Sequence, residues 1–144
     1  MLARHLDEVT RGKVIGEVTV HRAKSIRPTD ERMLRGKLTG AKIRQVGRRG
    51  KYLLFDLRAP RRAPFILLGH LGMTGRMYLQ PKRMPLPKHA AVSFGLGRKI
   101  FVFEDTRYFG RLTLDLAPLD HLGPEALGGA FDGAKLHLAL RRCS

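Results

Sequence analysis

The stretch KYLLFDLRAPRRAPFILLGHL, residues 51–71, holds two apolar runs separated by a segment rich in Pro and Arg. Short runs of this kind, bounded by Gly or Pro, are typical of β-strands. Similar runs, including residues 51–57 and 65–71 of this stretch, recur at residues 17–21, 43–46, 77–80, 91–94, 99–104 and 112–116. Regularly spaced short strands predict an antiparallel sandwich or barrel.

Helical patterns flank this β-rich region. Residues 2–9 place apolar side chains at helical spacing, without an N-cap residue before them. Asp30 is a suitable N-cap for a second helix, which we expect Gly36 and Gly40 to stop. Residues 132–144 favour a last helix. Because both terminal helices lack a natural start or stop, we expect the protein to continue beyond both ends.

Composition narrows the class of protein. At 144 residues the chain has the length of one domain, residues 1–144, with room for a real core. Lys and Arg total 28 against 12 Asp and Glu, and the resulting net charge of +16 predicts a polyanionic partner. With Cys143 as the single cysteine, neither a disulfide nor a cysteine-based zinc site is expected. No run resembles a membrane span or signal peptide, so we expect a cytoplasmic protein.

Three motifs are candidates for contacts with a polyanion. Residues 48–51 form a basic cluster in which Gly50 would admit a phosphate, although a solvated turn is the alternative. Residues 69–75, GHLGMTG, interrupt a strand with glycine, so Met73 either stands on an exposed loop or packs inward. Residues 104–110, EDTRYFG, read as a turn between two strands with a cation and two aromatic side chains at its tip.

Two further positions have an open interpretation. His89 follows a lysine and precedes a strand, where it either offers an imidazole to a phosphate or is an ordinary surface or core residue. Asp105 and Glu104 suggest a carboxylate pair, but an Asp that begins a turn is commoner. The residues alone therefore predict a polyanion-binding β domain.

Four segments taken together are more specific. RRGKYLLFDL, HLGMTGRM, FEDTRYFGRL and HLGPEAL, in this order, resemble the N-terminal domain of formamidopyrimidine-DNA glycosylase and its relative endonuclease VIII. The resemblance covers nearly the whole chain. It implies a mainly β fold with flanking helices, an antiparallel β-sandwich of that family's N-terminal type. It also implies base-excision DNA repair: oxidised purines are flipped out of duplex DNA and excised, and the backbone is nicked by β,δ-elimination.

The resemblance also implies roles for individual residues. Met73, Arg107 and Phe109 match the residues that fill the gap left by the flipped nucleotide, with Arg107 facing the orphaned base. A planar guanidinium with several donors and a rigid apolar ring suit these tasks. Lys51 and His89 would hold phosphates near the lesion, with Lys51 as support on the lesion side. His70 would belong to the same neighbourhood.

The chain departs from the family pattern at several positions. The family begins with a Pro-Glu pair, nucleophile and proton-transfer group, whereas this sequence begins Met1-Leu2-Ala3, so no catalytic residue is assigned. The family's zinc finger belongs to a C-terminal helix-two-turns-helix domain that we expect to lie outside this chain, so no cofactor or metal is expected here. Further departures from the family pattern are Thr106, Tyr108, Ala90 and Ala91.

Two classes of function follow. The first is a DNA glycosylase and lyase that acts on double-stranded DNA with oxidised bases and is inactive as these 144 residues alone. The second is a non-catalytic module that binds damaged DNA, or structured RNA, through its basic face. We expect neither a membrane nor an obligate protein partner, and a place beside the bacterial nucleoid.

Overall fold

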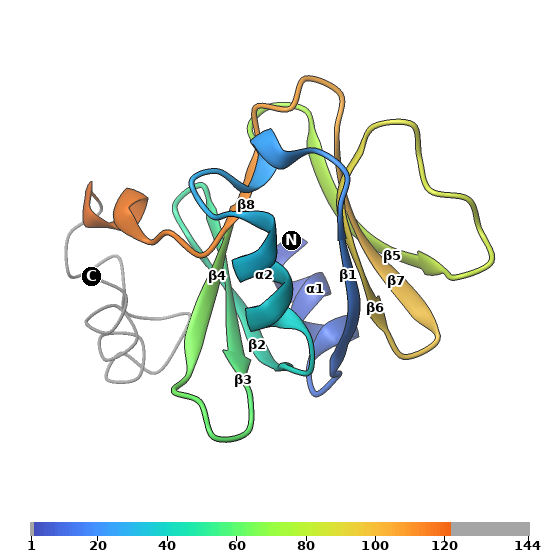
Figure 1. Ribbon diagram of the computed structural model, residues 1–144. Coiled ribbons are helices and arrows are strands. Elements are labelled where there is room, and N and C mark those ends of the chain that lie inside the picture. Colours follow the sequence, from blue (N-terminus) through green and yellow to red (C-terminus); the bar gives the residue numbers. More distant parts are fainter. Residues whose placement is uncertain (1, 122–144) are drawn as a thin grey trace.

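The computed structural model describes residues 2–121 and shows two four-stranded antiparallel sheets packed face to face (Figure 1). One sheet has the order β1-β6-β7-β5 and the other β2-β3-β4-β8. The strands are β1 (Ile15–Val20), β2 (Lys42–Arg49), β3 (Tyr52–Arg58), β4 (Phe65–His70), β5 (Gly75–Pro81), β6 (Ala90–Leu96), β7 (Lys99–Asp105) and β8 (Arg111–Thr113). The predicted sandwich is confirmed, and the barrel alternative is wrong.

Large apolar side chains from both sheets fill the space between them. Phe55 of β3, Phe94 of β6 and Phe101 of β7 are almost wholly buried. The rings of Phe94 and Phe101 stack with their centres 4.4 Å apart, and Phe55 meets Phe101 edge to face at 5.8 Å. Burying one such side chain contributes about 1.5–3 kcal/mol. These contacts fix the spacing of the two sheets.

The segment at residues 104–110 differs from the prediction. β7 and β8 belong to different sheets, so residues 106–110 cross between sheets and do not close a turn between paired strands. The strand expected at residues 112–116 ends at Thr113. There the amide of Leu114 donates to the hydroxyl of Thr29 at 3.0 Å, and local side-chain bonds of this kind replace the sheet ladder. A short 3-10 helix, η2 (Ala117–His121), follows.

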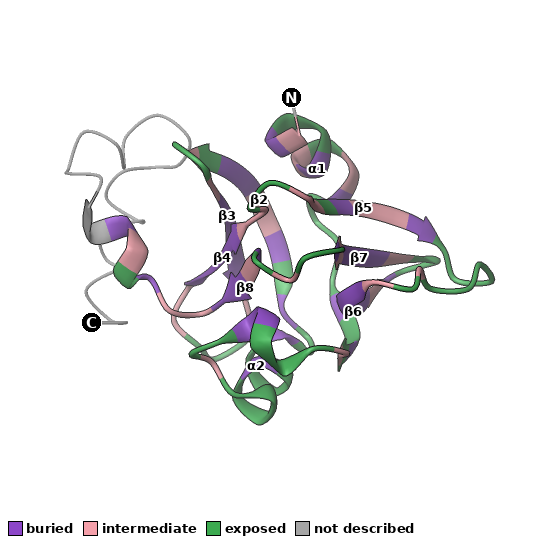
Figure 2. Ribbon diagram, turned by 90° about the horizontal axis from the view of Figure 1, so that it is seen from above, coloured by how far each residue is buried: buried purple, intermediate pink, exposed green. Residues whose placement is uncertain are grey.

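The two α-helices lie at opposite sides of the sandwich, as Figure 2 shows. α1 (Leu2–Thr10) buries Leu6, and α2 (Glu31–Leu38) buries Leu34 and Leu38. Asp30 is the predicted N-cap of α2, and its carboxylate accepts a 2.7 Å bond from the amide of Met33. The expectation that Gly36 stops this helix is wrong, because α2 continues through it to bury Leu38.

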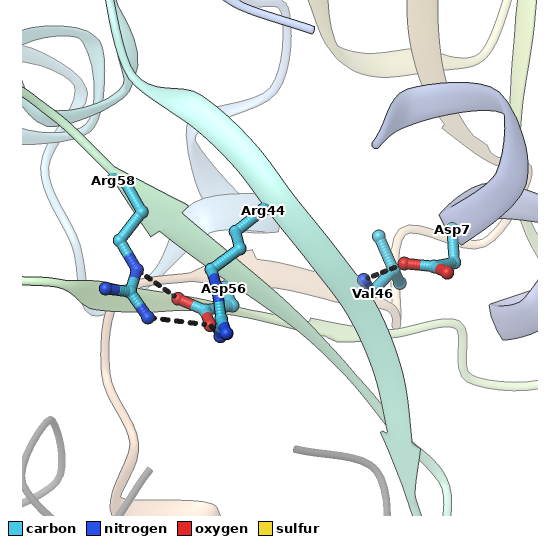
Figure 3. Close-up of polar contacts among 5 residues, drawn as sticks. All are labelled: Asp7, Arg44, Val46, Asp56 and Arg58. Atoms are coloured by element: carbon cyan, nitrogen blue, oxygen red, sulfur yellow. Dashed lines mark hydrogen bonds and ion pairs between the residues drawn. The ribbon is translucent and has the colours of Figure 1, made fainter. Parts of the chain in front are cut away.

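Two aspartates fasten the edge strand β2 (Figure 3). The amide of Val46 in edge strand β2 donates to Asp7 of α1 at 2.8 Å, which satisfies a donor that would otherwise lie open at the sheet edge. Asp56 of β3 pairs with Arg44 at 3.1 Å and with Arg58 at 3.2 Å. α1 is thereby fixed beside the end of the sandwich where β2 turns into β3.

Two expectations fall outside the described residues. The helix predicted at residues 132–144 and nearly all of the HLGPEAL segment lie beyond residue 121. Among the helices in residues 2–121, none is long and apolar enough to cross a membrane.

Candidate nucleic-acid interface

Two connections cross between the sheets at the same end of the sandwich (Figure 1). We call residues 71–74, from β4 to β5, the first crossover, and residues 106–110, from β7 to β8, the second crossover. Each crossover is bounded by paired strands, because His70 pairs with Arg111 and Gly75 pairs with Asp105. Both loops are therefore attached at both ends to regular sheet.

The first crossover presents Met73 to solvent. Its side chain is 92% exposed, so the alternative of an inward-packed methionine is wrong. Gly72 has a φ of +61°, which favours glycine, and a Cβ on Gly75 would lie 2.3 Å from the carbonyl oxygen of Leu71. The glycines of the motif thus allow a tight turn that keeps the side chain of Met73 exposed to solvent.

The second crossover is organised around Asp105. Its buried carboxylate accepts bonds from the amide of Gly110 at 2.7 Å, from the amide of Arg107 at 3.1 Å and from the Thr74 hydroxyl. Burial alone would raise the pKa of Asp105, but the hydrogen bonds from Thr74 and the loop amides outweigh burial and lower it. Asp105 begins a turn as predicted, and it also binds the first crossover.

The two crossovers pack directly against each other. A Cβ on Gly72 would lie 3.4 Å from the amide nitrogen of Gly110 and 3.6 Å from the Cβ of Phe109. Phe109 is 60% exposed and Arg107 is also exposed. The fold therefore brings Met73, Arg107 and Phe109 to one end of the molecule, on adjoining loops. Their roles in DNA binding stay predictions.

A basic hollow lies beside the crossovers. Its volume is about 230 Å³, and it is lined by Leu2 and Ala3 of α1 together with Arg48, Gly50, Lys51, Tyr52, Leu53, His70, Leu71 and Gly72. The rings of Tyr52 and His70 lie 5.4 Å apart. Burial lowers the pKa of His70, and the charges of Lys51 and Arg111 lower it further. Lys51 and His70 thus line the same hollow, and their place beside a lesion stays a prediction.

His89 lies at the second crossover and not in this hollow. Its Nδ1 is 3.0 Å from the hydroxyl of Tyr108, and its role in phosphate binding stays a prediction. Sequence reasoning missed Arg22 and Lys24, whose cations lie 5.0 Å from the ring centre of Tyr108 and 5.7 Å from that of Phe109. These residues are more than 80 positions away in sequence, so only the known fold could reveal the pairs.

The described residues show no metal centre: residues 2–121 contain no group of three or more His, Cys, Asp or Glu side chains that could hold an ion. A larger hollow of about 540 Å³ lies on the outer face of β1 and β6, away from Met73 and Phe109. We take the crossovers as the candidate site because they expose the apolar side chains of Met73 and Phe109 on adjoining loops.

A sequence model of the formamidopyrimidine-DNA glycosylase N-terminal domain matches residues 1–112. The chain belongs to the formamidopyrimidine-DNA glycosylase family.

Curated formamidopyrimidine-DNA glycosylases resemble the chain along most of its length. The protein of Acidothermus cellulolyticus is 38% identical over 146 residues, which cover 94% of this chain and 49% of the relative. That of Geobacter metallireducens is 39% identical over 147 residues, covering 96% and 52%. The chain thus spans about half the length of the curated relatives it matches.

Solved structures of the same family share the fold. A crystal structure of Lactococcus lactis Fpg in complex with DNA containing FAPY-dG superposes with a TM-score of 0.73 at 27% identity, covering 83% of this chain and 43% of that protein. The same glycosylase bound non-covalently to DNA with an AP site gives a TM-score of 0.71 at 28% identity, covering 78% and 40%. The predicted fold of the formamidopyrimidine-DNA glycosylase N-terminal type is confirmed.

Proposed function

We propose that this protein binds damaged duplex DNA in base-excision repair, with the two crossovers probing the base stack. The observation that carries the proposal is the pair of adjoining loops that expose Met73, Arg107 and Phe109 at one end of the sandwich. Exposed apolar side chains beside cations suit insertion between bases, since they replace stacking when a nucleotide leaves the helix. The Lactococcus lactis Fpg structures with damaged DNA support DNA as the partner.

Each exposed residue has a chemical task in this proposal. Phe109 supplies a flat ring to intercalate, Met73 adapts to the remaining space, and Arg107 donates hydrogen bonds to the orphaned base. Lys51 and His89 hold the DNA backbone, with His70 beside Lys51. The HLGM and R-x-F residues favour an oxidised purine as the lesion, as the family resemblance implies.

Excision of the base is a separate proposal. The hollow beside Lys51 and His70 contains Leu2 and Ala3, whose side chains offer neither a nucleophile nor a proton-transfer group. We infer that these 144 residues recognise damaged DNA and that cleavage of the glycosidic bond depends on chemical groups that they do not supply. Borohydride trapping on DNA containing 8-oxoguanine tests this: we expect no covalent adduct with the 144-residue polypeptide, and an adduct would refute the inference.

The binding proposal is tested by fluorescence anisotropy with three labelled nucleic acids. These are a duplex with 8-oxoguanine, the same duplex undamaged, and a hairpin RNA. We expect the damaged duplex to bind most tightly, with a loss of about 10³-fold or more between about 50 and 200 mM salt if six or more phosphates are engaged. Binding that is insensitive to salt would refute the proposal.

The hairpin RNA separates the second candidate function, a structured-RNA binder. The exposed ring of Phe109 and the basic excess support this alternative, because basic β domains also stack bases on aromatic rings. Tighter binding of the hairpin than of the damaged duplex would assign the crossovers to RNA.

A further inference from the structure

Tyr108 differs from its neighbours in the second crossover. Arg107 and Phe109 on either side of it are exposed, whereas Tyr108 is half-buried. Its φ of +56° lies in the left-handed region, where a side chain other than Gly or Asn is strained. Such a conformation persists only where surrounding contacts hold it, so the contacts of Tyr108 indicate what the strain achieves.

Tyr108 is held by contacts from separate parts of the fold. Its hydroxyl lies 3.0 Å from Nδ1 of His89, its ring lies 5.0 Å from the guanidinium carbon of Arg22, and its carbonyl accepts a 3.1 Å bond from Nη1 of Arg111. The same Arg111 nitrogen also donates to the carbonyl of Gly110 at 2.8 Å. The crossover is therefore fastened at its middle residue as well as at Asp105.

This fastening determines the direction of the neighbouring side chains. With Tyr108 half-buried, Arg107 and Phe109 on either side of it are the exposed side chains of this part of the loop. Phe109 is further accompanied by Lys24, whose ammonium nitrogen lies 5.7 Å from the ring centre. The tips are thus placed before any ligand arrives, which reduces the ordering that binding would require.

The direction of the hydrogen bond with His89 fixes which ring nitrogen carries a proton. A tyrosine hydroxyl that donates to Nδ1 of a neutral imidazole leaves the proton on Nε2, which is then a donor. A phosphate oxygen accepts such a bond without requiring a charged imidazole.

We propose that Tyr108 is a positioning residue that donates its hydroxyl proton to Nδ1 of His89, holding Arg107 and Phe109 outward and keeping the Nε2 proton of His89 for a DNA phosphate. The phosphate contact rests on the DNA-binding function proposed above, whereas the anchoring contact exists in the free protein. Tyr108→Phe removes only the hydroxyl and keeps the ring beside Arg22. Tyr78→Phe is the matched control, because it deletes another tyrosine hydroxyl, one that donates to Glu104 at 2.6 Å outside the crossovers.

The first measurement is the NMR spectrum of the free protein, with the imidazole of His89 neutral. In Tyr108→Phe we expect the ring-nitrogen chemical shifts of His89 to move toward a mixture of tautomers and the amide signals of residues 106–110 to shift or broaden. Tyr78→Phe should leave both unchanged. Identical His89 and loop signals in Tyr108→Phe and the unmodified protein would overturn the positioning role, whatever the protein binds.

The second measurement is affinity for the damaged duplex. We expect Tyr108→Phe to weaken binding about 3- to 10-fold, the effect of one lost hydrogen bond. The losses caused by Tyr108→Phe and His89→Ala should be less than additive, because both act through one contact. Full additivity would overturn the link between Tyr108 and the phosphate. An unmodified protein that shows the expected NMR signals but binds no DNA would refute the DNA-binding function and leave the anchoring contact standing.

Discussion

The hydroxyl of Thr74 donates a hydrogen bond to Oδ1 of Asp105 and so joins the first crossover to the second. Asp105 also receives two loop amides, which makes one buried carboxylate the common support of both loops. A group that accepts several bonds as an anion is costly to neutralise. The integrity of the whole interface should therefore depend on the charge of this residue.

Asp105→Asn tests that dependence. Replacing an ionised acceptor of several hydrogen bonds should lower the free energy of unfolding by about 1.5–3 kcal/mol, measured by urea denaturation near neutral pH. Because the folded-state pKa of Asp105 lies below its ordinary value of 3.8, the stabilisation is present above that value and is lost as the pH falls through the folded-state pKa. The difference between the two proteins should thus shrink in acid.

Phe109→Ala should weaken binding of the damaged duplex about 5- to 100-fold, the range expected for one lost base-stacking contact. The free energy of unfolding of the Phe109→Ala variant should change little, because the side chain of Phe109 is 60% exposed. Met33→Ala, at another exposed apolar side chain on α2, is the control for a general loss of apolar surface. Equal losses of affinity in the two variants would contradict a specific role for the ring.

Lys51→Ala should reduce the slope of log affinity against log salt concentration by about 1, as expected when one phosphate contact is removed. The measurement is a series of anisotropy titrations of the same duplex at several salt concentrations. Lys99→Ala removes an exposed cation from the first residue of β7, at the end of that strand opposite Asp105 and the crossovers. A similar change of slope in both variants would show that the basic excess acts without a defined site.

His70 should titrate below its ordinary pKa of 6.5 in the free protein, because burial and the charges of Lys51 and Arg111 disfavour the imidazolium. NMR titration of the histidine ring checks the direction. Lys51→Ala should raise the pKa of His70, and bound duplex should raise it too if a phosphate lies nearby. For a base with a lowered folded-state pKa, stability falls as the pH drops below the ordinary value. If the pKa of His70 is unchanged in Lys51→Ala, the charge of Lys51 does not act on His70.

The sequence predicted the strands well because their apolar runs report burial directly, as at residues 51–57 and 65–71. It failed at Gly36, since the helix penalty of one glycine, about 1 kcal/mol, is smaller than the gain from burying Leu38. It also failed at residues 104–110, because two successive strands carry no local mark of the sheet each will join.

The sequence predicts those parts of the candidate site that lie within one short motif. It does not predict contacts between segments that only the fold brings together. The motifs single out Met73 and Phe109 within their own loops; Phe109 is exposed as expected, and the structure decides between the two alternatives left open for Met73. The contact between His89 and Tyr108 and the cation of Arg22 beside the Tyr108 ring depend on sheet pairing over long separations in sequence. The sequence places Tyr108 at the loop tip and marks it as a departure from the family pattern, but its left-handed φ and half-buried side chain leave no trace in the residue type.

Each crossover starts in one sheet and ends in the other, with ladder pairs at both ends. Both loops therefore span the gap between the sheets, and the width of that gap is set by the buried rings of Phe55, Phe94 and Phe101. A smaller side chain in that core would let the two sheets approach each other and would shift the tips of both crossovers together. Core packing thus sets the distance over which the two loops can contact a ligand.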